Sequence, residues 1–172
     1  MTNRSFTSCR SGRATGRVRR TNSIAFPANL PERFLLDSSA LIAFLQAEPG
    51  APRVLDLLEK AVRIEAEVVA CFVSLTEVQY ITAYDHGEEP ARKAIADLKQ
   101  LSIRWQHSDD ALCASAAEVK AAHRISFADA FVVASALRWD AVLVHKDPEF
   151  ATVPAPLKQE MLPPKIPLPT AT

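Results

Sequence analysis

Short stretches with the composition of β-strands alternate with longer segments of helical spacing, and this alternation limits the folds open to the chain. The strand-like stretches lie at 33–37, 68–73, 103–107 and 141–145, and the segments between them repeat apolar residues every three or four positions. Strands separated by helices are joined by crossovers, which makes neighbouring strands parallel and covers both faces of their sheet. The pattern therefore predicts an α/β domain, a three-layer α/β/α sandwich around a central parallel sheet.

Two segments of different composition flank this alternating pattern. Residues 1–32 are rich in Arg, Ser and Asn and poor in aliphatic side chains, which predicts a disordered basic N-terminal extension. Three origins remain open for it: an upstream start codon, an arm that contacts nucleic acid, or an organellar transit peptide. Residues 153–172 contain six prolines, which predicts an extended C-terminal tail. We therefore expect one domain at 33–152, which suits a chain of 172 residues.

The balance of charge differs between the basic extension and the rest of the chain. Residues 1–33 carry seven arginines and one acid, whereas the remaining residues carry 13 basic and 19 acidic side chains. An acidic domain binds phosphate poorly by itself. Any contact of this domain with nucleic acid therefore needs a cation in between, or help from a basic partner or tail.

Composition also indicates the cellular location of the protein. No apolar run approaches the roughly 20 residues that span a bilayer, and the N-terminus lacks the apolar core of a secretory signal. The three cysteines are far apart and odd in number, which fits neither a disulfide framework nor a zinc site. We expect a cytoplasmic protein without membrane contact.

Four carboxylates stand where a predicted strand ends or the following helix begins: Asp37, Glu77, Asp129 and Asp147. The carboxyl ends of parallel strands lie at one edge of a sheet, so these positions are expected to converge. Four acids gathered there repel one another unless a cation neutralises them, and oxygen ligands suit Mg²⁺ or Mn²⁺. The pattern indicates an acidic metal site.

Each of these acids also has a simpler explanation as a local capping group. Ser126 and Asp129 have the S-x-x-D spacing of a capping box, and Ser74 and Glu77 have the equivalent S-x-x-E spacing. Asp37 is a candidate N-cap, and the fourth acid precedes a proline and is a candidate turn opener. Capping explains single helix starts, but it does not explain why acids recur at the same end of successive strands.

Other chemistries have less support in the sequence. It contains no G-x-G-x-x-G, G-x-x-x-x-G-K-[ST], G-x-S-x-G or H-E-x-x-H motif, and its four glycines leave little room for phosphate-binding loops. The four histidines share no ligand spacing and are expected at the surface or in loops. A phosphotransfer protein of the receiver or phosphatase kind also sets acids at strand ends, but here the first strand ends in D-S-S, with no second acid in reach.

The segments FLLDSSALIAFLQAEPG, SLTEVQY, ISFADAFVVASAL and AVLVHKDPEF resemble, in this order, the motifs of PIN-domain ribonucleases. The resemblance is strongest to the VapC-type toxins of bacterial toxin–antitoxin pairs. It implies a small PIN-like α/β sandwich with an acidic pocket that holds one or two Mg²⁺ or Mn²⁺ ions. It also implies a metal-dependent endoribonuclease, a hydrolase that cleaves phosphodiester bonds of RNA.

The resemblance assigns roles to individual residues. Asp37 and Asp129 match the principal metal ligands, and Glu77 and Asp147 match the acids that complete the catalytic site through direct or water-mediated contacts. Ser39 matches the small hydroxyl residue after the first aspartate, which orients that ligand or the scissile phosphate.

The family also implies partners. Its toxins pair with a small antitoxin whose tail covers the active site, and they form homodimers. Two features depart from the family pattern: His145 stands where a threonine or serine is common, and the 32-residue leader is unusual. An alternative function is a catalytically lapsed PIN-like module that binds RNA or protein.

Overall fold

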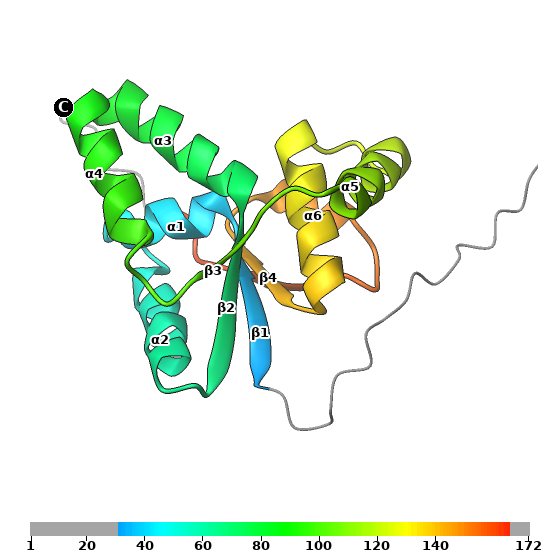
Figure 1. The fold of residues 1–172 in the computed structure, drawn as a ribbon, viewed down its shortest axis with the longest axis horizontal. Helices are drawn as coiled ribbons and strands as arrows, with labels where there is room; N and C mark the ends of the chain where they lie inside the picture. Colours follow the sequence, from blue (N-terminus) through cyan, green and yellow to red (C-terminus); the bar gives the residue numbers. More distant parts are fainter. Residues whose placement is uncertain (1–30, 166–172) are drawn as a thin grey trace, which may run out of the picture. The chain divides into compact units, whose positions relative to one another are not determined.

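The computed structural model describes residues 31–165, which form a five-stranded parallel sheet with helices on both faces (Figure 1). The strand order is β3-β2-β1-β4-β5, and every neighbouring pair is parallel. The strands are β1 (Glu32–Leu36), β2 (Ala66–Cys71), β3 (Arg104–Gln106), β4 (Val142–His145) and β5 (Lys158–Met161). The helices are α1 (Ser38–Leu45), α2 (Ala51–Val62), α3 (Phe72–His86), α4 (Glu88–Leu98), α5 (Asp110–Ala122), α6 (Phe127–Trp139) and the 3-10 helix η1 (Pro148–Thr152). The predicted three-layer α/β/α sandwich is confirmed.

The sheet separates two apolar cores. Successive side chains of a strand point to opposite faces, so Phe34 and Leu36 of β1 join the core under α1 to α4. Leu35 joins the second core, under α5, α6 and η1. All three are buried, and each buried side chain of this size stabilises the fold by about 1.5–3 kcal/mol. A strand buried on both faces is apolar throughout, which is why β1 and β2 were recognisable as short apolar runs.

One helix begins earlier than the sequence predicts. The stretch 68–73 is predicted as a strand followed by a helix from Ser74, whereas β2 ends at Cys71 and α3 begins at Phe72. Cys71 is the N-cap and makes no side-chain capping hydrogen bond. The boundary was misplaced because a buried strand and the buried first turn of a helix are equally apolar.

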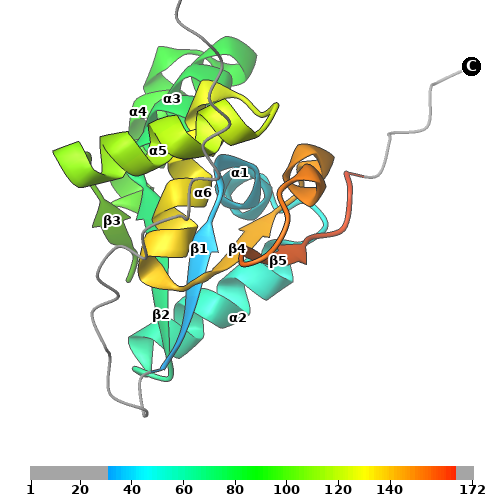
Figure 2. The same ribbon diagram turned by 90° about the vertical axis from the view of Figure 1, so that its right-hand side faces the viewer.

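The C-terminal stretch differs most from its prediction. Residues 153–172 are predicted as an extended tail beyond a domain ending at 152, whereas β5 pairs in parallel with β4 and completes the sheet (Figure 2). Leu157 and Leu162 are buried in the two cores. A side chain could not replace the hydrogen of Gly50 without displacing its neighbour, because a Cβ there would lie 3.1 Å from Leu162 Cβ. The domain therefore extends beyond residue 152 to Leu162 at least.

The described residues include only a small part of the predicted extension. Residues 1–30 and 166–172 lie outside them, so the expected basic leader and the last residues of the expected tail lie there too. In residues 31–165, no helix is both long enough and apolar enough to cross a membrane.

Candidate functional site

The carboxyl ends of β1, β2 and β4 meet at one edge of the sheet, where α1, α3 and α6 begin (Figure 1). The four predicted acids are attached to these elements. Asp37 joins β1 to α1, Glu77 lies in the second turn of α3, Asp129 lies in the first turn of α6, and Asp147 follows β4. The charges of the other three each raise the pKa of Glu77, so all four belong to one electrostatic cluster.

Asp37 is buried and held by hydroxyl and amide donors. Its side chain is 3% exposed, and its Oδ2 accepts hydrogen bonds from the backbone N of Ser39 at 3.1 Å and from Ser39 Oγ at 2.6 Å. Ser38 Oγ donates to Oδ1 at 3.4 Å. Burial raises the pKa of Asp37, the charge of Asp129 adds to this effect, and the bonds from Ser39 and Ser38 only partly offset it. Asp37 thus caps α1 and faces another acid of the site.

Ser39 connects two segments of the site through one hydroxyl group. Its Oγ donates to Asp37 Oδ2 and accepts a hydrogen bond of 2.9 Å from the backbone N of Lys146. Lys146 directly precedes Asp147. The hydroxyl therefore ties the first acid of the site to the segment that carries the last one.

Glu77 has a carboxylate oxygen without a partner. Within the described residues its Oε2 is buried and makes no hydrogen bond. Burial raises the pKa of Glu77 most, the three neighbouring acids raise it further, and a hydrogen bond with Ser38 lowers it. The capping-box explanation is wrong here, because Ser74 lies inside α3 and its buried Oγ makes no hydrogen bond within residues 31–165. Glu77 is not a capping residue.

Asp129 does cap its helix. Ser126 Oγ accepts a hydrogen bond from Asp129 N at 3.0 Å, and Asp129 Oδ2 accepts one from Ser126 N at 3.1 Å, which completes a capping box. The capping box uses one carboxylate oxygen, so the other remains compatible with coordination. Asp147 similarly caps η1, its Oδ1 accepting from Glu149 N at 2.8 Å.

The chemistry of the donors fits a divalent cation, although the ligand geometry is not complete. Within residues 31–165, no three Asp, Glu, His or Cys side chains are grouped closely enough to hold a metal ion as they stand. The acids nevertheless offer hard oxygen ligands, among them a buried oxygen of Glu77 that has no partner in the described residues, and burial together with mutual repulsion raises the pKa of Glu77 and Asp37. A cation would pair with the free oxygen and offset the repulsion, and Asp37 and Asp129 are the residues that would hold it.

The structure also brings in residues that sequence reasoning missed. Lys146 Nζ lies 2.7 Å from Glu48 Oε2, and these partners are 98 positions apart in the chain. No local pattern identifies such a pair. His145, expected in a loop or at the surface, ends β4 and is 1% exposed, with its ring against Phe150 at 4.9 Å. In the described part of the chain neither of its ring nitrogens has a hydrogen-bond partner.

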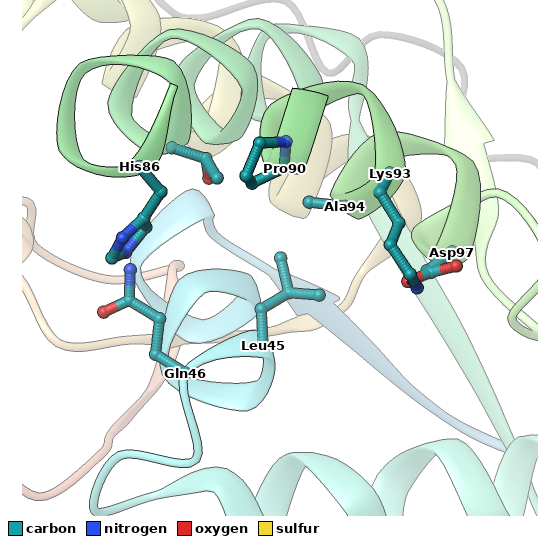
Figure 3. Close-up of a pocket in the computed structure, with 8 residues that line it drawn as sticks. Leu45, Gln46, His86, Pro90, Lys93, Ala94 and Asp97 are labelled. Carbon is teal, nitrogen blue, oxygen red and sulfur yellow. The ribbon is translucent and has the colours of Figure 1, made fainter. Parts of the chain in front are cut away.

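A cavity of about 550 Å³ lies elsewhere, between the end of α1 and the helices α3 and α4 (Figure 3). Its lining includes Leu45, His86, Pro90 and Lys93, and none of the four acids takes part in it. The hollow is therefore separate from the acidic edge of the sheet.

Comparisons with known proteins agree with this architecture. Residues 34–156 match the model of the PIN domain family. The VapBC2 structure from Rickettsia felis, described as bound to a promoter DNA fragment, aligns with a TM-score of 0.62 at 14% identity over 76% of this chain and 99% of that chain. VapBC from Salmonella typhimurium gives a TM-score of 0.61 at 13% identity over 76% and 98% of the two chains.

A third structure is VapC20 from Mycobacterium tuberculosis, described as a toxin that cleaves the sarcin-ricin loop. It aligns with a TM-score of 0.55 at 19% identity over 69% of this chain and 92% of that chain. The curated proteins contain no significant match. The parallel sheet with acids at its carboxyl edge and the match over most of the domain lead to one conclusion: this chain belongs to the PIN domain family and has the fold of the VapC toxins.

Proposed function

We propose that this chain is a Mg²⁺-dependent endoribonuclease, the toxin half of a toxin–antitoxin pair, with Mn²⁺ as an alternative cation. The observation that carries the proposal is the cluster of four acids at one edge of the sheet, where burial and mutual repulsion raise the pKa of Glu77 and its Oε2 lacks a hydrogen-bond partner among the described residues. PIN-family membership and the similarity to toxin–antitoxin structures support it.

We assign each residue of the site a separate role in RNA cleavage. When bound, a divalent cation lowers the pKa of water and offsets charge that develops on the phosphate oxygens. Asp37, fixed by Ser39, and Asp129, fixed by its capping box, would hold the cation. Glu77 Oε2 is free of hydrogen bonds in the described structure and accepts a proton from the attacking water. Asp147 completes the site.

The partners follow from the same proposal. RNA is the substrate, and the chain forms a homodimer. A small antitoxin covers the site with its tail. A guanidinium group of such a tail carries the positive charge and the planar donors that carboxylates bind best, so it can take the place of the cation among these acids. The acidic balance of residues 34–172 suits a basic partner.

Replacing Asp129 by asparagine tests the proposal. The amide side chain keeps an oxygen for the capping box but removes the charge, so we expect the fold to persist and RNA cleavage to fall by about a hundredfold or more. The measurement is cleavage of total cellular RNA by purified protein, freed of any partner, with Mg²⁺ or Mn²⁺ and with EDTA.

Asp109→Asn is the matched control. Asp109 caps α5, accepting from Leu112 N at 2.7 Å, and it takes no part in the acidic cluster. Cleavage should therefore persist in this variant. Equal cleavage by wild type and Asp129→Asn would refute the assignment of Asp129. No cleavage by the wild type with any metal would favour the lapsed binding module instead.

A further inference from the structure

A lysine lies next to the acidic site in the chain, but its ammonium group pairs with a glutamate outside that site. Lys146 directly precedes Asp147, and its ammonium lies 2.7 Å from Glu48 Oε2. Both side chains are only 11% exposed. Glu48 lies in the turn after α1, so this ion pair lies between that turn and the end of β4.

The backbone of Lys146 is close to the acids. Lys146 N donates to Ser39 Oγ at 2.9 Å, and the same hydroxyl donates to Asp37 Oδ2 at 2.6 Å. Two hydrogen bonds thus separate the lysine backbone from a carboxylate of the site. Asp147 is the next residue in the chain, and a lysine side chain has a flexible four-carbon stem, so Asp37 and Asp147 are the carboxylates that a released ammonium would approach. There it would neutralise the acids and compete with a divalent cation.

Glu48 is well suited to retain this ammonium. Its Oε2 binds Lys146, and its Oε1 lies 2.7 Å from Lys165 Nζ. The hydrogen bond with Lys146 lowers the pKa of Glu48 most, and the bond with Lys165 lowers it further, so the carboxylate stays ionised at neutral pH. A nearly buried ion pair strongly resists the loss of one partner, because the remaining charge is left without compensation.

We propose that Glu48 is a positioning residue that withholds the Lys146 ammonium from the acidic site and so keeps Asp37, Asp129 and their neighbours available to a divalent cation. The inference rests on the proposed function in assigning a cation to those acids. It adds that the affinity for the cation depends on a carboxylate that does not touch the cation.

The test is direct titration of the full-length protein with MnCl₂ by calorimetry, which measures cation binding without any RNA cleavage. Glu48→Gln keeps the shape of the side chain but releases the lysine, so we expect Mn²⁺ affinity to fall by about tenfold. Circular dichroism and the Tm in EDTA show whether the variant is folded.

A second variant distinguishes two roles for Glu48: withholding the lysine ammonium from the acids, or only supporting the loop. In Glu48→Gln/Lys146→Met the competing ammonium is absent, so Mn²⁺ affinity should return to near the wild-type value. If Glu48 merely supported the loop, the double variant would bind as weakly as Glu48→Gln. The double variant also removes both charges together, so it carries no unpaired buried charge.

Lys165→Met is the matched control. It removes the other lysine partner of Glu48, whose side chain is 67% exposed, and should leave Mn²⁺ affinity unchanged. Unchanged affinity in Glu48→Gln, or no recovery in the double variant, would overturn the inference while leaving the nuclease proposal intact. Absence of Mn²⁺ binding by the wild type would remove the cation site of the proposed function, and this inference with it.

Discussion

At the scale of single residues, the acidic site places carboxylates where burial and neighbouring charges make ionisation unfavourable. Glu77 and Asp37 have raised pKa values because burial and neighbouring acids disfavour their charged forms. Such groups reduce the stability of the metal-free fold, and on the proposed function they do so in return for a place where a cation would bind. Stability and function are therefore expected to respond in opposite directions to the loss of a carboxylate.

Glu77→Gln should stabilise the metal-free protein at neutral pH. Because the pKa of Glu77 is raised from its ordinary 4.5, the folded state binds the proton more tightly than the unfolded state. The free energy of unfolding contributed by this group therefore falls as pH rises from the ordinary pKa through the raised one. The glutamine variant lacks this loss, and its gain at pH 8 should be on the order of 1 kcal/mol or less, given solvent screening.

Urea unfolding in EDTA at pH 5 and pH 8 measures this difference. Glu118→Gln is the control, because Glu118 is an exposed acid on α5 and is not among the charges that raise the pKa of Glu77. A glutamine variant at position 77 that is less stable than the wild type at pH 8 would contradict the prediction.

The sequence predicted these residues only where their positions next to predicted strands and helices are a local signal. The positions of Asp37 and Asp129 at the ends of predicted strands and the starts of helices are visible in the chain, and the structure places both there. The pairing of Glu48 with Lys146 is not visible, because it depends on a turn and a strand end brought together by the fold. The sequence analysis did not predict the burial of His145, because burial of a polar side chain depends on the residues that pack around it in the fold.

At the scale of elements, α6 combines a structural cap with a site acid. Ser126 and Asp129 each accept a hydrogen bond from the backbone of the other, so the cap fixes the carboxylate in place. The sequence predicted both the helix and the cap, since S-x-x-D spacing is a local signal. The start of α3 was less predictable, because apolar residues continue across the boundary and Phe72 packs on Phe131 at 5.5 Å.

Ser126→Ala should affect stability and cleavage together. Loss of the capping oxygen leaves the amide of Asp129 without its acceptor and costs about 1 kcal/mol in unfolding free energy. It also loosens the hold on the Asp129 carboxylate, so RNA cleavage should fall. Asp109→Ala removes the corresponding cap of α5, where Asp109 accepts from Leu112 N. Unfolding by urea and RNA cleavage are measured on both variants.

The comparison between these two caps shows whether a loss of cleavage comes from the cap of α6 or from general destabilisation. Both variants should lose stability, Asp109→Ala also through its ion pair with Arg138, but only Ser126→Ala should lose cleavage. If both lose cleavage equally, the effect comes from general destabilisation and the cap of α6 has no special role in the site.

At the scale of the whole domain, the last strand changes where the domain ends. Proline-rich composition indicated a tail, but the prolines at 154, 156, 163 and 164 flank β5 instead of interrupting it. Glu160 of β5 also forms an ion pair with Arg53 of α2, with Nε 2.7 Å from Oε1. A four-residue strand at the edge of a sheet has too few residues to show periodicity, so composition alone could not reveal it.

Leu162→Ala should cost about 2–5 kcal/mol in unfolding free energy, the usual loss for a buried leucine. The side chain is 3% exposed and belongs to the core under α1 to α4. Met161→Ala is the control, because Met161 is 55% exposed and its loss should change stability little. Urea unfolding distinguishes the two. Equal, small effects would show that this stretch lies outside the folded domain.

The strand order also sets when the site can come into being during synthesis. β1 leads into Asp37, yet one of its two neighbours in the sheet is β4, which leads to Asp147 and is made later. β5, the last strand of the described residues, then pairs with β4. Domains fold as units, so the four acids are gathered at one edge only after β4 has been made. For the nuclease proposed above, RNA cleavage therefore begins only after β4 has joined β1 in the sheet.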